Sequence, residues 1–185
     1  FIVLTGCMAQ AFPDECSQIS EVDLVIGNTD YDKLPEIVIN ALNSCLEHIL
    51  VGEHHKTYTD IGVTKMDEHT RAFIKIEDGC NRFCSYCIIP YTRGRVRSRQ
   101  PESVLQEICG LVKEGYREFV LTGIHISSYG LDFEEKNPKK YLSELIRDIN
   151  AIEGVERIRI GSFEPMILTD DFVAEIASCD KMCPH

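Results

Sequence analysis

Short apolar runs alternate with longer amphipathic stretches along most of this chain. The runs are rich in Ile, Val, Leu and Phe and are too short for helices, so they favour buried strands. The longer stretches repeat apolar residues at helical spacing, which favours helices with one buried face. We expect strands at 1–4, 21–26, 72–76, 118–122 and 157–160, and helices at about 32–46, 101–114, 138–153 and from 170 onward.

The residues at several expected helix ends are typical helix start and stop signals. Asn137 and Thr169 precede two of the helices, where a side-chain oxygen can cap exposed N–H groups. Gly115 and Gly154 follow two helices, where a left-handed residue is favoured. The repeat predicts buried faces made of Ile37, Val38, Ala41, Leu42 and Cys45, of Val104, Leu105, Ile108, Leu111 and Val112, and of Tyr141, Leu142, Leu145, Ile146, Ile149 and Ile152.

The alternation of strands and helices predicts an α/β fold with parallel sheets and right-handed crossovers. Residues 51–70 lack a sustained period and mix polar residues with glycine, so we expect an interdomain connection there. Residues 1–50 then form a small α/β piece, and residues 71–185 form a second part with three βα units.

Three cysteines follow the apolar run at 72–76 with the spacing Cys80-x3-Cys84-x2-Cys87. Thiolates hold iron–sulfur clusters, and three ligands on a four-iron cluster leave one iron open to a small molecule. Two alternatives are a zinc site and disulfides. No His or fourth Cys follows at the usual structural-zinc spacing, and the first residues do not resemble a signal peptide. Spacing alone favours iron–sulfur over zinc.

Together with Tyr86, the cysteines in Cys80-x3-Cys84-x-Tyr86-Cys87 resemble the signature of the radical S-adenosylmethionine (radical SAM) family. The resemblance implies that the three thiolates hold a [4Fe-4S] cluster, that S-adenosylmethionine (SAM) chelates the fourth iron, and that Tyr86 lies near the adenine of SAM. It also implies that residues 71–185 are the first half of a partial TIM barrel of six βα units.

The flanking segments 78–80, 88–94 and 97–99 resemble the methylthiotransferases, which add a methylthio group to a modified tRNA adenosine or to a ribosomal-protein aspartate. Residues 5–10 resemble the third-cysteine motif of the N-terminal methylthiotransferase domain, so residues 1–50 would be the C-terminal part of that domain. This implies that Cys7 is a ligand of a second [4Fe-4S] cluster whose other two cysteines precede residue 1.

Segments 77–81 and 88–99 are most similar to the methylthiotransferase branch that modifies C2 of N6-threonylcarbamoyladenosine at tRNA position 37. The isopentenyladenosine branch comes second and the ribosomal-protein branch third. The implied partners are a tRNA anticodon loop and a reductant such as flavodoxin or ferredoxin, in the cytoplasm. Another radical SAM enzyme without sulfur insertion, or a non-catalytic module with structural zinc, stays open as an alternative.

Ligands of parallel α/β folds bind at the carboxyl ends of the strands. The resemblance implies that Thr122 and Gly123 line the methionine side of SAM, and that Ser162 and Glu164 face SAM or its ribose. His125 and Tyr129 lie in a loop that could face substrate, although a structural role fits them equally well.

The composition of the 185 residues gives a formal net charge of −11, which is unusual for a nucleic-acid binder because phosphate contacts need Lys and Arg. Arg93, Arg95, Arg97 and Arg99 concentrate positive charge beside the cysteines. No apolar run approaches the ~20 residues of a membrane span. Nine cysteines without a secretory leader indicate a reducing compartment. Because half of the expected barrel is absent, we expect the chain to be a fragment that is inactive by itself.

Overall fold

The structure is a computed structural model that describes residues 1–43, 48–62 and 70–184. The chain folds into two compact units. The first unit contains residues 1–59 and 80–95, and the second contains residues 60–79 and 96–185. Residues 80–95, named here the cysteine loop, therefore group with the N-terminal residues. The expected domain boundaries at 50 and 70 stay a prediction.

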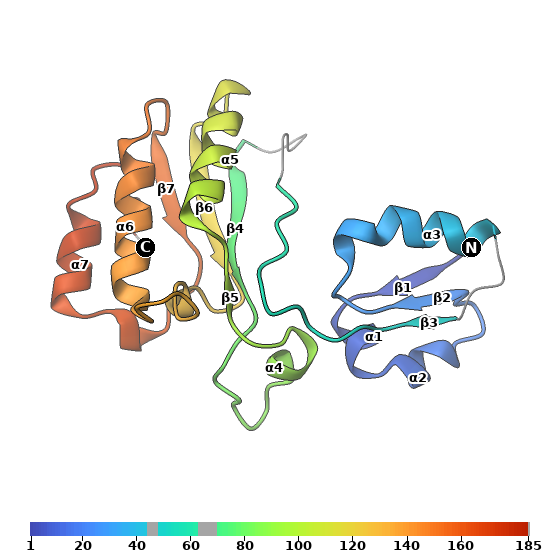
Figure 1. The fold of residues 1–185 in the computed structure, drawn as a ribbon. Helices are drawn as coiled ribbons and strands as arrows, with labels where there is room; N and C mark the ends of the chain where they lie inside the picture. Colours follow the sequence, from blue (N-terminus) through green and yellow to red (C-terminus); the bar gives the residue numbers. More distant parts are fainter. Residues whose placement is uncertain (44–47, 63–69, 185) are drawn as a thin grey trace. The chain divides into compact units, whose positions relative to one another are not determined.

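The first unit contains a parallel sheet with the strand order β1-β2-β3 (Figure 1). Strand β1 is Val3–Thr5, β2 is Leu24–Ile26 and β3 is Ile49–Leu50. The strands expected at 1–4 and 21–26 are confirmed in shortened form. Strand β3 was missed because two apolar residues are too short a run to indicate a strand.

The described part of the first unit also contains five short helical segments. They are α1 (Cys7–Ala11), α2 (Pro13–Ser17), the 3-10 turn η1 (Tyr31–Lys33), α3 (Leu34–Asn43) and α4 (Ile89–Thr92) in the cysteine loop. A small core of Ala9, Cys16 and Val25 joins α1 and α2 to the sheet. Helix α3 forms where expected, but its apolar face is not buried, and Leu42 is exposed. Cys45, predicted to lie in the core, falls outside the described residues.

The second unit contains a four-stranded sheet with the order β5-β4-β6-β7 (Figure 1). Strands β4 (Ala72–Asp78), β6 (Glu118–Gly123) and β7 (Arg157–Ile160) are parallel, as expected. The short strand β5 (Arg97–Ser98) pairs antiparallel with the end of β4 and was not expected. The α/β fold with parallel sheets is therefore confirmed.

Helices α5 (Pro101–Lys113), α6 (Pro138–Ala151) and α7 (Asp170–Ala177) alternate with these strands, with 3-10 turns η2 (Ile126–Ser128) and η3 (Pro165–Ile167) after β6 and β7. This order confirms the three βα units. The apolar side chains of β4, β6 and β7 pack against α5 and α6 in one core that includes Ile74, Ile108, Phe119, Leu145 and Ile158.

Most of the expected helix caps are present. Gly115 adopts φ +101°, and its N–H donates to the Val112 carbonyl, as a helix end requires. The Asn137 side chain accepts a hydrogen bond from the Lys140 N–H at 3.3 Å. Thr169 lies at the cap position of α7 but makes no side-chain cap bond. The sequence position of Cys109, next to the buried face of α5, favours a core side chain over a metal ligand, but Cys109 is exposed.

A further strand pairing begins after α7. Met182 forms a parallel bridge with Ile158 of β7, and the Cys183 N–H donates to the Ile158 carbonyl at 2.9 Å. In a barrel of six βα units, a fourth parallel strand would start at this point. Among the described residues, no helix combines the length and the apolar character that crossing a membrane requires.

Candidate cofactor site

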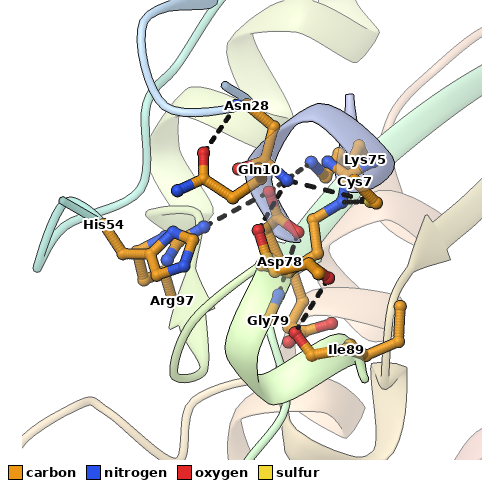
Figure 2. Close-up of polar contacts among 12 residues, drawn as sticks. Cys7, Gln10, Asn28, His54, Lys75, Asp78, Gly79, Ile89 and Arg97 are labelled. Atoms are coloured by element: carbon orange, nitrogen blue, oxygen red, sulfur yellow. Dashed lines mark hydrogen bonds and ion pairs between the residues drawn. The ribbon is translucent and has the colours of Figure 1, made fainter. Parts of the chain in front are cut away.

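Polar contacts join the two chain segments that flank the cysteine loop, residues 78–79 and Arg97, which we name the cysteine loop stem. Asp78, the last residue of β4, accepts a hydrogen bond from the Gly79 N–H at 2.9 Å. The other Asp78 carboxylate oxygen lies 2.8 Å from Lys75 Nζ and 3.4 Å from a guanidinium nitrogen of Arg97 (Figure 2). Arg97 belongs to β5, where it pairs with Asp78 in the antiparallel register. These contacts fix the chain direction on both sides of the cysteine loop.

Inside the cysteine loop, backbone bonds bring its two ends together. The Cys80 N–H donates to the Gly94 carbonyl at 3.1 Å. Gly94 has φ +79°, a conformation that glycine adopts readily. A turn between the other two cysteines is closed by the Cys87 N–H, which donates to the Cys84 carbonyl at 2.9 Å. The two ends of the loop are thus hydrogen-bonded to each other, and the loop carries all three cysteines.

The three cysteines differ in exposure. Cys80 is buried, Cys84 is exposed and Cys87 is half-buried, and none of them is in a disulfide. The Arg82 N–H points at Cys80 Sγ at 3.5 Å. Among the described residues, no group of three His, Cys, Asp or Glu side chains is gathered as a metal site. The structure therefore places the three thiols on one loop but does not bring their sulfur atoms to one point. Tyr86 projects from the same loop and is 91% exposed.

Cys7 lies at the start of α1 in the first unit, and its sulfur has two nitrogen neighbours. Arg93 Nε of the cysteine loop donates to Cys7 Sγ at 3.1 Å. Asn28 Nδ2 lies 3.7 Å from the same sulfur, and both Cys7 and Asn28 are labelled in Figure 2. Asn28 also donates to the Thr92 carbonyl at 2.6 Å, which ties it to helix α4. The two cysteine motifs, far apart in sequence, are therefore neighbours within the first unit.

The remaining expected site residues follow β6 and β7 in the second unit. Thr122 and Gly123 end β6 and are half-buried. Ser162 and Glu164 follow β7, and Ser162 is exposed. Glu164 is fixed at its backbone, where its N–H donates to Ser127 Oγ at 2.9 Å.

His125 joins the loops after β6 and β7. Its Nε2 lies 3.0 Å from Glu164 Oε1, and its Nδ1 lies 2.6 Å from Ser128 Oγ. The structure thus brings Glu164 and His125 together at the carboxyl edge of the parallel strands, where ligands of such sheets bind.

The family model described as the radical SAM superfamily matches residues 74–182, which include the three cysteines, most of β4 and all of β5, β6 and β7. The chain belongs to the radical SAM superfamily. The resemblance that the cysteine motif carries is therefore confirmed.

Curated relatives of this radical SAM chain are methylthiotransferases. A threonylcarbamoyladenosine tRNA methylthiotransferase of Bacillus subtilis is 39% identical over 100% of the chain and 41% of the relative. A tRNA-2-methylthio-N(6)-dimethylallyladenosine synthase of Clostridium tetani is 38% identical, with the same coverage of 100% and 41%. A ribosomal protein uS12 methylthiotransferase of Clostridium botulinum is also 38% identical, again over 100% and 41%. The chain thus spans about 41% of the length of these relatives.

The cysteine loop of the radical SAM chain fits an iron–sulfur cluster in the chemistry of its donors. Three thiols outside any disulfide supply the soft ligands that iron–sulfur clusters need. The N–H of Arg82 beside Cys80 Sγ is the kind of backbone donor that stabilises a cluster sulfur. The residues that would hold the cluster are Cys80, Cys84 and Cys87.

Glu77, next to the cysteine loop stem, was not recognised as a site residue from sequence. Its side chain is 0% exposed, and one carboxylate oxygen accepts the His125 N–H at 2.7 Å. Burial is the main cause that raises the pKa of Glu77 to about 8, and the nearby Asp78 charge adds to this effect. The other oxygen, Oε1, is buried without a hydrogen-bond partner in the described structure. A neutral acid therefore lies beneath the carboxyl edge of this radical SAM sheet.

The alternating pattern of β4 does not indicate that Glu77 is buried. In β4 the side chains of Ala72, Ile74 and Ile76 are buried, so the alternating pattern assigns Glu77 to the same face as Phe73 and Lys75, which are more exposed. The register with β6 shifts between Lys75 and Glu77, and the carboxyl instead faces Gly123. The only sequence signal was an acid directly before the cysteine loop stem.

Of the four arginines expected to concentrate positive charge beside the cysteines, two are buried and paired with acids. Arg97 is buried against Asp78, and Arg99 is buried in ion pairs with Asp60 and Glu107. Arg93 donates to Cys7, whereas Arg95 is exposed and stacks on Phe83. Buried charges must be paired, and for Arg97 and Arg99 the acids of the second unit provide the pairing. Of these four arginines, Arg95 is thus the one presented to solvent.

Proposed function

We propose that the complete protein is a radical SAM methylthiotransferase that adds a methylthio group to C2 of N6-threonylcarbamoyladenosine at tRNA position 37. The observation that carries the proposal is the hydrogen bond from Arg93 to Cys7. It makes the cysteine loop a neighbour of the motif expected to hold a second cluster. A radical SAM enzyme without sulfur insertion does not need such a second cysteine motif beside the first. The curated relatives support the same chemistry, since each is named as a methylthio-forming enzyme.

The choice of substrate rests on sequence similarity. The B. subtilis relative that is named for threonylcarbamoyladenosine is 39% identical, against 38% for the relatives named for dimethylallyladenosine and for ribosomal protein uS12. The resemblance of segments 77–81 and 88–99 to the first branch points the same way.

The residues of this chain would bind two iron–sulfur clusters and SAM. Cys80, Cys84 and Cys87 hold a [4Fe-4S] cluster, and Cys7 is one ligand of a second. Tyr86, Thr122, Gly123, Ser162 and Glu164 bind and orient SAM. When bound, the first cluster supplies the electron that cleaves SAM reductively. The Glu164 backbone is held by its N–H, which donates to the Ser127 hydroxyl, and its carboxylate lies 3.0 Å from His125 Nε2.

The partners follow from the proposed chemistry. The substrate is the anticodon loop of a tRNA, and a small electron carrier such as flavodoxin or ferredoxin reduces the cluster. Both partners and the modification place the protein in the cytoplasm. The net charge of −11 means that attraction to RNA has to come from local positive groups rather than from the whole chain.

The test is complementation with mass spectrometry of the products. The complete protein is expressed in a strain that lacks its own methylthiotransferases, and tRNA nucleosides and ribosomal protein uS12 are analysed. We expect methylthio-threonylcarbamoyladenosine to appear and the other two products to be absent. Methylthio-isopentenyladenosine or methylthiolated uS12 in its place would move the protein to one of the other branches. No methylthio product, together with SAM cleavage in vitro, would contradict sulfur insertion.

A further inference from the structure

Three side chains of the cysteine loop form a stack within the first unit. The guanidinium carbon of Arg95 lies 4.4 Å from the centre of the Phe83 ring. The Phe83 ring in turn meets the Tyr91 ring edge to face, with centroids 5.4 Å apart and an interplanar angle of 89°. We name these three residues the aromatic stack. A cation over an aromatic ring and an edge-to-face ring pair each stabilise such an arrangement.

The aromatic stack faces solvent rather than a core. Tyr91 is 68% exposed and Phe83 is 37% exposed. Phe83 also has φ +49°, in the left-handed region that bulky residues rarely adopt. An exposed aromatic residue in a strained backbone conformation gains little from burial, so the fold does not explain its position. Strain of this kind gathers at ligand sites.

The backbone beneath Tyr91 is firmly held although its ring is exposed. The Tyr91 N–H donates to the Ile88 carbonyl at 2.9 Å, and His54 Nε2 lies 2.9 Å from the Tyr91 carbonyl oxygen. The next residue, Thr92, is fully buried. The ring is therefore presented from a fixed main chain, which lowers the entropy cost of binding a flat ligand.

A hollow of about 430 Å³ opens beside Tyr91 in the same unit. Its lining includes Tyr91, Tyr86 and Cys87 from the cysteine loop and Gln10 from α1. The volume falls within the roughly 300–1,000 Å³ that small-ligand sites occupy. Because Tyr86 and Cys87 belong to the expected SAM and cluster site, the hollow puts the exposed Tyr91 ring next to that site.

We propose that the aromatic stack is the platform on which a base of a single-stranded RNA loop stacks. The inference rests on the proposed function, which makes a tRNA anticodon loop the substrate, and it names the residues that receive that loop. Aromatic rings stack on bases of any sequence, and the exposed guanidinium of Arg95 supplies positive charge for a phosphate or a second base face. Tyr91, Phe83 and Arg95 are distinct from Tyr86, which is assigned to SAM.

The binding test uses the complete protein reconstituted with its clusters and a fluorescent anticodon stem–loop RNA. Tyr91→Ala and Arg95→Gln are compared with Tyr91→Phe, which keeps the ring. Phe73→Ala and Arg147→Gln serve as matched controls, because both residues are exposed and lie in the second unit. SAM affinity is measured in parallel for each variant.

We expect Tyr91→Ala to weaken RNA binding by roughly tenfold, since removal of one stacking partner costs about that much. Arg95→Gln should weaken RNA binding and reduce its dependence on salt. Tyr91→Phe and the two control variants should bind RNA like the wild type, and SAM affinity should not change. Unchanged RNA binding by Tyr91→Ala and Arg95→Gln overturns the proposal, as does a loss confined to SAM binding or a wild type that does not bind RNA.

Photo-crosslinking keeps the test decisive if a variant folds poorly. A stem–loop with 8-azidoadenosine in the loop is irradiated with the wild-type protein, and adducts are mapped by mass spectrometry. Adducts on Tyr91 or Phe83 support the platform, and adducts confined to other segments overturn it. The proposed function fails separately, because it is judged by the methylthio product and not by RNA binding.

Discussion

At the scale of single residues, Glu77 is the side chain whose behaviour follows most directly from its surroundings. The carboxyl is fully buried near the end of β4, and one of its oxygens accepts a hydrogen bond from the His125 N–H. Burial outweighs this hydrogen bond and the nearby Lys75 charge, so the pKa of Glu77 rises from 4.5 to about 8. The folded state therefore binds a proton that the unfolded state has lost at neutral pH.

The sign of the resulting pH dependence is fixed by linkage. Below pH 4.5 the Glu77 carboxyl is protonated in both the folded and the unfolded chain, and its contribution to stability is fully present. Between pH 4.5 and about 8 only the folded chain keeps the proton, so this contribution is lost as the pH rises through that range. The free energy of unfolding should fall by up to about 1.4 kcal/mol per pH unit in that window. Glu77→Gln should flatten this dependence, as measured by chemical denaturation between about pH 5 and pH 8. A Gln variant that keeps the wild-type slope would rule out Glu77 as its source.

Gly123 shows why a small residue ends β6. A Cβ at this position would lie 3.0 Å from Glu77 Oε2 and 3.2 Å from the Glu77 carbonyl oxygen. We therefore expect Gly123→Ala to lower the free energy of unfolding by about 1–3 kcal/mol, because the backbone oxygen cannot move aside easily.

Gly110 is the matched control for Gly123. It lies inside helix α5, and a Cβ there would meet nothing within 4 Å. Gly110→Ala should raise stability by about 0.5–1 kcal/mol, the usual gain for alanine in a helix. Thermal melts of both variants in the same buffer measure the contrast, and equal shifts of the two melts would mean that the contact with Glu77 is not limiting.

At the scale of elements, the ion pairs of Arg99 join the segment before β4 to helix α5. The Arg99 guanidinium lies 2.7 Å from Asp60 Oδ1 and contacts Glu107 of α5, and the side chains of Arg99 and Glu107 are each 6% exposed. Arg99→Ala would leave the buried Glu107 carboxylate without this cation. We expect a loss of about 3–5 kcal/mol in unfolding free energy, measured by urea denaturation.

Arg157 provides the comparison for Arg99. It pairs with Glu118 at 2.8 Å, but its side chain is 51% exposed. Solvent screens such pairs, so Arg157→Ala should leave the denaturation midpoint close to that of the wild type. If the two variants lose equal stability, burial does not set the strength of these ion pairs.

The elements that sequence predicts are those with a long periodic pattern. Strands β4 and β6 and helices α5 and α6 carry six or more residues of clear period, and they form where expected. The four-residue strand β7 also forms where expected, because Ile158 and Ile160 alternate with two arginines. The short elements β3, β5, α1, α2 and α4 were missed because none of them shows such a repeat. The cysteine spacing indicated the loop, but neither the contact of Arg93 with Cys7 nor the burial of Glu77 has a local sequence signal.

At the scale of the whole molecule, charge and function have to be reconciled. The formal net charge of −11 repels RNA at long range, and Arg97 and Arg99 of the basic run are buried in ion pairs. Association with RNA in the proposed function then depends on a few exposed groups such as Arg95 and on aromatic stacking. Stacking is less sensitive to salt than phosphate contacts are.

The central claim is that Cys80, Cys84 and Cys87 hold a four-iron cluster with one iron open to SAM. The most direct test is anaerobic iron and sulfide analysis with electron paramagnetic resonance of the reduced protein, with and without SAM. The Cys7→Ser variant of the complete protein isolates this cluster from the second one. We predict about four irons per chain and a signal that SAM perturbs. Cys84→Ser should lose both, and Cys109→Ser, an exposed cysteine of α5, should lose neither. Zinc without sulfide, or a signal that SAM leaves unchanged, would contradict the account.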